Sequence, residues 1–344
     1  HRWTKTLRPI ETSAPPTKIA DIEQAASILV FGTSLADTQP ITYLRVRKAA
    51  LNSGTAVVVA SDAPTDVDAF AKIVLRYRPG TADELAKGLE RAMRVIKNLS
   101  LDGFEQSTAA HTERFTGVVA ADLEAAANLI ANAPVMISSA SLYDTSSAAQ
   151  TVSSLQSIAV ATAGALNIYS ENGNDQGAMM LGVTPGSGGK NTHEILRAAA
   201  LGQIKSLWLV GDPLKTHPNS KLVQEAMENV DFLVVQSTLK SDACSYASVI
   251  LPMDAPVEQE GSYTNIEGRC QYAAAALAVS GDSKPAWRVY GEMLMRIRGG
   301  KPMFNAREVL AEIAAEVPSF DVPEADVALG RSQTLKPAND EVYA

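Results

Sequence analysis

Residues 230–244 read Val230-Asp231-Phe232-Leu233-Val234-Val235-Gln236-Ser237-Thr238-Leu239-Lys240-Ser241-Asp242-Ala243-Cys244, and residues 247–252 continue as Ala247-Ser248-Val249-Ile250-Leu251-Pro252. The apolar run from Phe232 to Val235 is typical of a strand buried in a parallel sheet, and the polar residues after it form the turn at its carboxyl end. In an open parallel sheet, such turns line the crevice that binds ligands. This segment therefore predicts an α/β fold in which the carboxyl ends of the parallel strands line a ligand-binding crevice.

Strand and helix patterns alternate along the rest of the chain. We expect strands at 27–31, 56–60, 134–138, 206–210, 231–236 and 247–251, and helices at 40–52, 81–97, 121–132, 146–164, 193–201, 220–227, 285–298 and 305–316. Pro40 suits a first helical turn, Gly54 a left-handed cap, and Thr81 with Glu84 a capping box. Residues 65–74 are expected to form a short helix or loop.

This alternation predicts two Rossmann-like lobes, each a parallel sheet flanked by helices. We divide the chain into an extended lead-in at 1–18, a first α/β lobe at 19–130, a second α/β lobe at 131–280, and a short helical and coil tail at 281–344. The absence of an initiator Met before His1 suggests a piece of a longer or processed polypeptide.

Composition argues against several classes of function. The net charge of −8 disfavours nucleic acid as a partner, because phosphate binding needs a basic face. No apolar run approaches the ~20 residues of a membrane span. Two cysteines, Cys244 and Cys270, are too few for an iron–sulfur cluster, which normally takes four, and the four histidines show no zinc-ligand spacing. We therefore expect no metal site, no nucleic-acid contact and no direct membrane span.

A second motif follows the opening segment: Glu258-Gln259-Glu260-Gly261-Ser262-Tyr263-Thr264-Asn265-Ile266-Glu267-Gly268-Arg269-Cys270-Gln271. With Ile28-Leu29-Val30-Phe31-Gly32-Thr33 and Arg78-Pro79-Gly80-Thr81-Ala82-Asp83-Glu84-Leu85, in this order, the chain resembles the molybdopterin oxidoreductase superfamily over roughly residues 20 to 300. The segment Asn174-Asp175-Gln176-Gly177-Ala178, with Gly182-Val183-Thr184-Pro185-Gly186, is similar to the large iron–sulfur subunit (G chain, 75-kDa type) of respiratory NADH:quinone oxidoreductase, complex I.

The resemblance implies that the second lobe, at 131–280, is a degenerate dinucleotide-binding type with a nucleotide pocket at one strand end. Gly211-Asp212-Pro213 stands where the superfamily usually has Gly-x-Asn-Pro, and this turn would approach the guanosine end of a molybdopterin guanine dinucleotide. Asp212 could bind a ribose hydroxyl or repel a phosphate, and a plain strand-to-helix turn is the favoured interpretation. Gly32-Thr33-Ser34-Leu35 also lacks the Asn-Pro. We interpret the pocket as vestigial, with no bound cofactor, and its candidate residues are Gly211, Asp212, Pro213, Gln236, Thr238, Glu260, Asn265 and Arg269.

We expect no catalytic residue in this chain. The carboxylates of Glu258, Glu260 and Glu267 could in principle do acid–base work, but no His or Lys partner stands near them in sequence. Packing is the favoured role for Glu260, Asn265 and Arg269, with Arg269 as a counterion that holds the turn by paired hydrogen bonds. Residues 182–189 lack Walker spacing and are expected to form a surface loop.

The resemblance implies a scaffolding role in the peripheral arm of complex I, on the cytoplasmic or matrix side of the energy-transducing membrane. [4Fe-4S] and [2Fe-2S] clusters would lie upstream, and the partners would be the flavin-carrying and iron–sulfur subunits. Residues 272–344 are too short for the β-barrel that covers the cofactor in molybdenum enzymes. The main alternative is a fragment of an active molybdopterin-dependent oxidoreductase, such as a formate dehydrogenase, which would bind the dinucleotide. A third hypothesis is a free-standing module that keeps a nucleotide.

Overall fold

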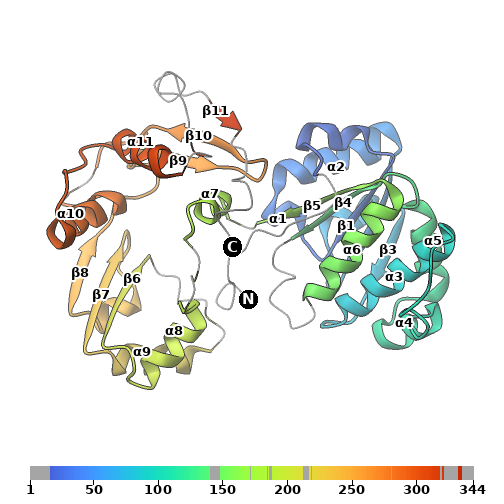
Figure 1. Ribbon diagram of the computed structural model, residues 1–344, viewed down its shortest axis with the longest axis horizontal. Helices are drawn as coiled ribbons and strands as arrows, with labels where there is room; N and C mark the ends of the chain where they lie inside the picture. Colours follow the sequence, from blue (N-terminus) through green and yellow to red (C-terminus); the bar gives the residue numbers. More distant parts are fainter. Residues whose placement is uncertain are drawn as a thin grey trace. The chain divides into compact units, whose positions relative to one another are not determined.

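The computed structural model describes residues 16–139, 148–170, 172–183, 185, 188–211, 217, 219–279, 281–317, 320 and 332–334. The chain forms two compact units that divide between Asn172 and Gly173. We call residues 9–172 unit 1 and residues 173–344 unit 2, and Figure 1 shows both in ribbon form.

Unit 1 is built around a five-stranded sheet in which every pairing is parallel. Its strands are β1 (Ser27–Phe31), β2 (Ala56–Ser61), β3 (Ile73–Arg76), β4 (Val135–Ser139) and β5 (Ala165–Tyr169), in the order β3-β2-β1-β4-β5. This is the Rossmann-type order, in which the chain crosses from one half of the sheet to the other between β1 and β4. The predicted α/β class with parallel sheets is confirmed.

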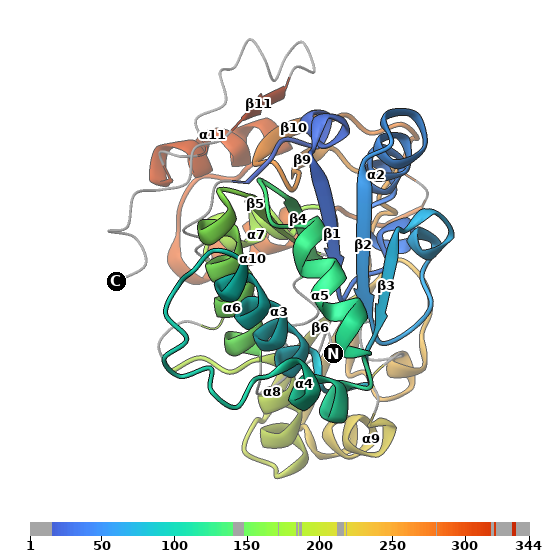
Figure 2. The same cartoon turned by 90° about the vertical axis from the view of Figure 1, so that its right-hand side faces the viewer.

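Helices pack on both faces of this sheet (Figures 1 and 2). They are η1 (Ile19–Gln24), α1 (Leu35–Thr38), α2 (Pro40–Ser53), η2 (Asp66–Phe70), α3 (Ala82–Ile96), α4 (Ala109–Thr116), α5 (Ala120–Leu129) and α6 (Ala148–Thr162). Alternate strand residues such as Leu29 and Phe31 share one core cluster with Leu85 and Leu89 of α3 and Leu155 of α6. This alternation follows from the two-residue period of a strand.

The expected helix ends are partly confirmed. Pro40 occupies the first turn of α2, and Gly54 caps that helix with a φ of 69°. The capping box expected at Thr81 is wrong, because the Thr81 hydroxyl donates to Arg78 O at 2.7 Å instead of capping α3. Before η2, Asp68 accepts two hydrogen bonds from Thr65: its Oδ2 accepts from the Thr65 N–H at 3.2 Å, and its Oδ1 accepts from the Thr65 hydroxyl at 2.8 Å.

The division of the chain differs from the expected one. β4 pairs with β1 through Ile28↔Val135 and with β5 through Val135↔Ala165, so residues 131–172 complete the first sheet. The boundary therefore lies at Asn172, and not near residue 130. The strands β3 and β5 and the helix α4 were also not expected, because each is short or lies in a segment that we interpreted as loop or connection.

Tyr77 is expected to make unit 1 less stable as the pH rises in the alkaline range. Its ring is 3 % exposed and stacks on Phe31, with ring centroids 6.0 Å apart. Burial raises the pKa of Tyr77 well above its ordinary value of 10.0. The unfolded chain therefore releases the Tyr77 proton at a lower pH than the folded chain does. The contribution of Tyr77 to the stability of unit 1 is fully present below pH 10.0 and is lost as the pH rises above that value.

We expect unit 1 of the wild type to lose about 1.4 kcal/mol per pH unit above pH ~10 from this one group. The Tyr77→Phe variant keeps the ring and removes the ionisation, so it is expected to lose less. Urea denaturation followed by circular dichroism at several pH values measures the difference between the two proteins. Parallel stability curves for the two proteins would contradict the prediction.

The described residues of unit 2 form two three-stranded sheets. Strands β6 (Ser206–Val210), β7 (Phe232–Ser237) and β8 (Val249–Pro252) form a parallel sheet in the order β6-β7-β8, and β9 (Gly261–Thr264), β10 (Arg269–Ala273) and β11 (Ser332–Thr334) form an antiparallel one in the order β11-β10-β9. The other elements are α7 (Asp175–Met180), α8 (Thr192–Ala200), α9 (Ser220–Asn229), η5 (Asp242–Ser245), α10 (Ala286–Arg298) and α11 (Ala306–Glu316). Leu196 of α8, Met227 of α9 and Leu233 of β7 share one core cluster.

The expected tail is part of unit 2. Helices α10 and α11 match the ranges predicted at 285–298 and 305–316. Leu310 of α11 and Phe320 share a core cluster with Cys270 of β10, and β11 pairs with β10. Helix α11, Phe320 and strand β11 are therefore packed against the hairpin of β9 and β10. In the part of the chain that the structure describes, no helix has the length and apolar character needed to cross a membrane.

Candidate functional site

The two units repeat one three-stranded arrangement, β1-β2-β3 in unit 1 and β6-β7-β8 in unit 2, and in each a glycine follows the first strand. Gly32 and Gly211 have positive φ values of 64° and 73°. The Gly32 N–H donates to Ala60 O at 2.7 Å, and the Gly211 N–H donates to Gln236 O at 2.7 Å. Because the same hydrogen bond ends both strands, the carboxyl edges of the two sheets can be compared position by position.

The repeat continues through the second and third strands. The Lys72 N–H donates to Val57 O at 2.7 Å, and the Ser248 N–H donates to Leu233 O at 2.8 Å. Residues 61–76 and 237–252 carry the same residue at four matching positions, which are Ser61 and Ser237, Asp66 and Asp242, Ala71 and Ala247, and Leu75 and Leu251. This internal similarity is the sequence signal from which β3 could have been predicted.

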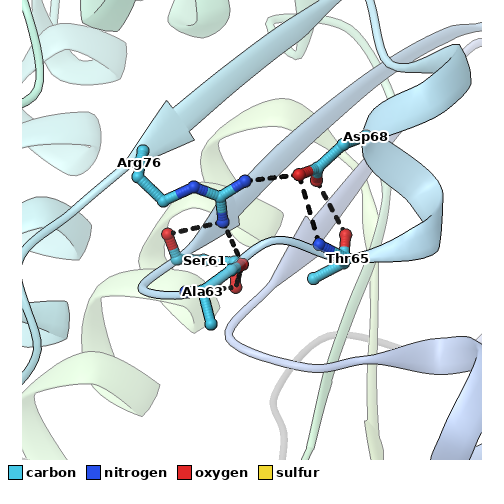
Figure 3. Close-up of polar contacts among 5 residues, drawn as sticks. All are labelled: Ser61, Ala63, Thr65, Asp68 and Arg76. Carbon is cyan, nitrogen blue, oxygen red and sulfur yellow. Dashed lines mark hydrogen bonds and ion pairs between the residues drawn. The ribbon is translucent and has the colours of Figure 1, made fainter.

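In unit 1, side chains of the unit itself occupy the edge of the sheet at the carboxyl ends of β2 and β3 (Figure 3). The Arg76 guanidinium donates to Ser61 O at 3.1 Å and to Ala63 O, and it forms an ion pair with Asp68. Asp68 in turn accepts both hydrogen bonds from Thr65. Since one charged network satisfies the loop oxygens there, this end of unit 1 is closed by its own side chains.

Unit 2 cannot build that network. Cys244 stands at the position of Asp68, and Pro252 stands at the position of Arg76. Neither side chain can form an ion pair, and Pro has no N–H. The matching edge of unit 2, at the ends of β6, β7 and β8, is thus without the closing ion pair of unit 1.

Two buried polar side chains lie at this edge of unit 2. Gln236, the second-last residue of β7, is 0 % exposed, and Asp254, two residues after β8, is 1 % exposed. Neither polar atom of either side chain has a hydrogen-bond partner among the residues that the structure describes. A buried polar group without a partner costs about 1–3 kcal/mol, and a charged group costs more. Such atoms are what a site for a polar ligand provides.

The main chain of Asp254 is held in place independently of its carboxylate. Asp254 O accepts from Gln259 Nε2 at 2.9 Å and from the Thr238 hydroxyl at 3.3 Å, and its N–H donates to Lys284 O at 3.3 Å. Three hydrogen bonds therefore hold the main chain of Asp254, while its two carboxylate oxygens have no hydrogen-bond partner among the described residues. We name Gly211, Gln236, Thr238 and Asp254 the β7–β8 edge site.

Sequence interpretation found three of these four residues. Gly211, Gln236 and Thr238 were expected at one strand edge, and the hydrogen bonds above bring them together there. Asp212 and Pro213 lie outside the described residues. Asp254 was missed, although it follows the predicted strand at 247–251 and matches Arg78 in the repeat, a position occupied by a charged residue in both units.

The remaining candidates belong to the β9–β10 hairpin and have protein partners. Glu260 accepts from the Ala306 N–H at 2.9 Å and from the Tyr272 hydroxyl at 2.6 Å, so it ties the hairpin to the start of α11. Asn265 Oδ1 accepts from the N–H groups of Glu267 at 3.0 Å and Arg269 at 2.9 Å. These contacts support packing roles for Glu260 and Asn265, while the role predicted for the Arg269 side chain stays a prediction.

Asn174 and Gly177 pack closely against each other and against Thr264 of β9. Asn174 has a φ of 70°, and its Oδ1 accepts from the Thr264 N–H at 2.8 Å. A Cβ placed on Gly177 would lie 2.4 Å from Asn174 Oδ1 and 3.1 Å from Thr264 Oγ1. The Asn-x-x-Gly spacing thus has a packing reason in this structure.

The Gly177→Ala variant is expected to destabilise unit 2 by about 1–3 kcal/mol, because the added methyl group overpacks this contact. Urea denaturation followed by the fluorescence of Trp208 and Trp287 measures the effect. The matched control is Gly173→Ala, where nothing lies within 4 Å of the added Cβ. Equal shifts for the two variants would show that the contact with Asn174 is not what requires glycine.

The chain is similar to a number of curated proteins, and two of them show the extent of the match. The NADPH-Fe(3+) oxidoreductase subunit alpha of Geobacter sulfurreducens is 30% identical over 353 residues, which cover 88% of this chain and 41% of that protein. The putative formate dehydrogenase YrhE of Bacillus subtilis is 23% identical over 376 residues, covering 92% of this chain and 37% of the relative. The chain therefore spans only about two fifths of the length of these relatives.

A solved structure shares the fold. Acetylene hydratase from Pelobacter acetylenicus superposes with a TM-score of 0.70 at 16% identity, over 92% of this chain and 55% of that one. These relatives do not show the specific likeness to the complex I subunit that we expected from the sequence. The sequence profile of molybdopterin oxidoreductases matches residues 10–296, and with the parallel sheets and the strand-end glycines described above, the chain belongs to the molybdopterin oxidoreductase family.

Proposed function

We propose that this chain is the nucleotide-binding part of a molybdopterin-dependent oxidoreductase, and that its β7–β8 edge site holds the guanosine end of a molybdopterin guanine dinucleotide. Family membership and the relatives named as an NADPH-Fe(3+) oxidoreductase and a formate dehydrogenase support this class of reaction. The observation that carries the proposal is the pair of buried side chains, Gln236 and Asp254, without protein partners among the described residues.

The chemistry of the donor set fits a guanine base. Guanine offers an acceptor at O6 and a donor at its exocyclic N2 amine. The Asp254 carboxylate supplies acceptors for such donors, and the Gln236 amide supplies both a donor and an acceptor. Gly211 has no side chain, so a ligand can approach its main chain closely.

The residues of this chain bind and orient, and the molybdenum–pterin group supplies the electron-transfer chemistry when it is bound. The three main-chain hydrogen bonds of Asp254 fix the carboxylate before a ligand arrives, so little conformational entropy is lost on binding. Catalytic side chains are not assigned to this chain.

The test is the metal and nucleotide content of the whole polypeptide, purified with its natural subunits from cells supplied with molybdate or tungstate. We expect near-stoichiometric metal and guanine nucleotide after acid release. Asp254→Asn should lower both at least about tenfold, equivalent to about 1.4 kcal/mol of binding free energy. The control is Asp242→Asn, an exposed aspartate at the neighbouring η5, which should keep both.

Purified wild-type protein with neither metal nor guanine nucleotide would contradict the proposal and favour the second candidate, a scaffold in the peripheral arm of complex I. One observation favours that candidate: the ion-pair network of Arg76 and Asp68 fills the matching edge of unit 1, as expected for a lobe that has lost a ligand. A scaffold would be recovered with flavin-carrying and iron–sulfur subunits, and Asp254→Asn would change no ligand content.

A further inference from the structure

The matching edges of the two units carry different side chains at the position of Gln236. The Gly211 N–H donates to Gln236 O, and the Gly32 N–H donates to Ala60 O, each at 2.7 Å. The shared hydrogen bond makes Ala60 the equivalent of Gln236, and both residues are 0 % exposed. Because the side chain of Ala60 is a methyl group, this position in unit 1 offers a base neither the donor nor the acceptor of the Gln236 amide.

The position of Asp254 carries the opposite chemistry in unit 1, because it is occupied there by Arg78. An ionised carboxylate only accepts hydrogen bonds, whereas a guanidinium only donates them. The Arg78 guanidinium donates to Arg114 O at 2.9 Å and to Phe115 O at 3.2 Å, in the last turn of α4. Arg78 therefore holds the end of a helix, and it cannot accept a hydrogen bond from the exocyclic amine of guanine.

The polar atoms at the edge of unit 1 already have protein partners. Two main-chain oxygens at the end of β2 accept from the Arg76 guanidinium (Figure 3). None of the buried side-chain atoms that lack a partner among the described residues belongs to residues 60–78. In the matching stretch 236–254, Gln236 and Asp254 both have such atoms. Because an unpaired buried polar group costs stability, this contrast indicates that a ligand satisfies the edge of unit 2, while unit 1 satisfies its own.

We infer, on the basis of the function proposed above, that the chain holds one guanine nucleotide, at the β7–β8 edge site, and that the matching edge of unit 1 holds none. Two repeated edges with the same side chains would bind two bases, one in each unit. In unit 1, however, Ala60 and Arg78 stand in place of Gln236 and Asp254. Among the described residues, the set of groups that fits guanine is therefore present at the edge of unit 2 and absent from the matching edge of unit 1.

The first measurement is the content of guanine nucleotide and of molybdenum or tungsten in the whole polypeptide, purified with its natural subunits. Chains without the cofactor contribute neither component, so the ratio of guanine to metal does not depend on how completely the protein is loaded. We expect about one guanine nucleotide per metal ion and no more than about one per chain. About two guanine nucleotides per metal ion or per chain would overturn the inference and leave the proposed function standing. A preparation without guanine nucleotide would overturn both.

Two variants then test the two edges separately. Asp254→Asn, in unit 2, is expected to lower the guanine content per polypeptide at least about tenfold. Asp68→Asn, which breaks the ion pair with Arg76 in unit 1, is expected to leave that content unchanged. Circular dichroism checks that each variant is folded, and the wild-type ratio decides where a variant does not accumulate. A content that is only halved by Asp254→Asn, or that is halved by Asp68→Asn, would place a second nucleotide in unit 1 and overturn the inference. An unchanged content in Asp254→Asn would overturn the proposed site as well.

Discussion

Replacing Arg94 by Met is expected to lower the free energy of unfolding of unit 1 by about 3–5 kcal/mol, because it leaves the buried carboxylate of Glu90 without its partner. Glu90 is 3 % exposed, and its Oε1 accepts from Arg94 Nε at 3.0 Å and from Nη2 at 2.9 Å. Both residues lie on α3, four positions apart, so the helix itself brings the pair together. Met keeps an apolar stem of similar length and removes only the charge and its hydrogen bonds.

The measurement is urea denaturation followed by circular dichroism. Trp208 and Trp287, whose positions the structure describes, lie in unit 2, so their fluorescence reports the unfolding of unit 2 and serves as the internal control. The double variant Glu90→Gln with Arg94→Met buries no charge and is expected to recover much of the loss. A single variant no less stable than the double one would show that the buried carboxylate is not the cause.

Replacing Phe31 by Ala is expected to destabilise unit 1 by about 3–5 kcal/mol, the range for deleting a large aromatic side chain from a core. Phe31 is 0 % exposed, stacks on Tyr77, and belongs to the core cluster that joins the sheet to α3, α5 and α6. The cavity would lie at the end of the central strand, where neighbours on both sides are held by hydrogen bonds and relax little.

The matched control is Phe115→Ala. Phe115 is on α4 in the same unit and is 46 % exposed, so its loss is expected to cost no more than about 1 kcal/mol. Circular dichroism in urea again gives the difference between the two variants. Similar losses for Phe31 and Phe115 would mean that the central strand is less tightly packed than the structure shows.

Local patterns predicted the elements whose signals lie within a few residues. The apolar run before Gln236 predicted β7, and Pro40 and Gly54 predicted the ends of α2, because proline and a left-handed glycine act on the backbone where they stand. The capping box failed for a related reason. Thr81 has the right spacing to Glu84, but a nearer acceptor, Arg78 O, takes its hydroxyl.

The candidate site was predicted in part. Gly211, Gln236 and Thr238 follow predicted strands, so their place at one edge follows from the parallel sheet alone. Asp254 gave no such signal, since an aspartate after a strand is ordinary on a surface. Its importance comes from 1 % exposure and from the absence of a partner among the described residues, and both depend on residues distant in sequence.

The amino-acid sequence by itself determined the α/β class, most strands and helices, and the molybdopterin oxidoreductase resemblance, because periodicity, turn chemistry and motif spacing are carried by neighbouring residues. Only the tertiary structure decided that residues 135–169 complete the first sheet, and that Arg76 closes one strand edge while Pro252 leaves the matching edge unclosed. It also decided that β6 has a neighbouring strand on one side only among the described residues. These features arise from pairing and burial between segments far apart along the chain, and local patterns do not encode which distant segment becomes the neighbour.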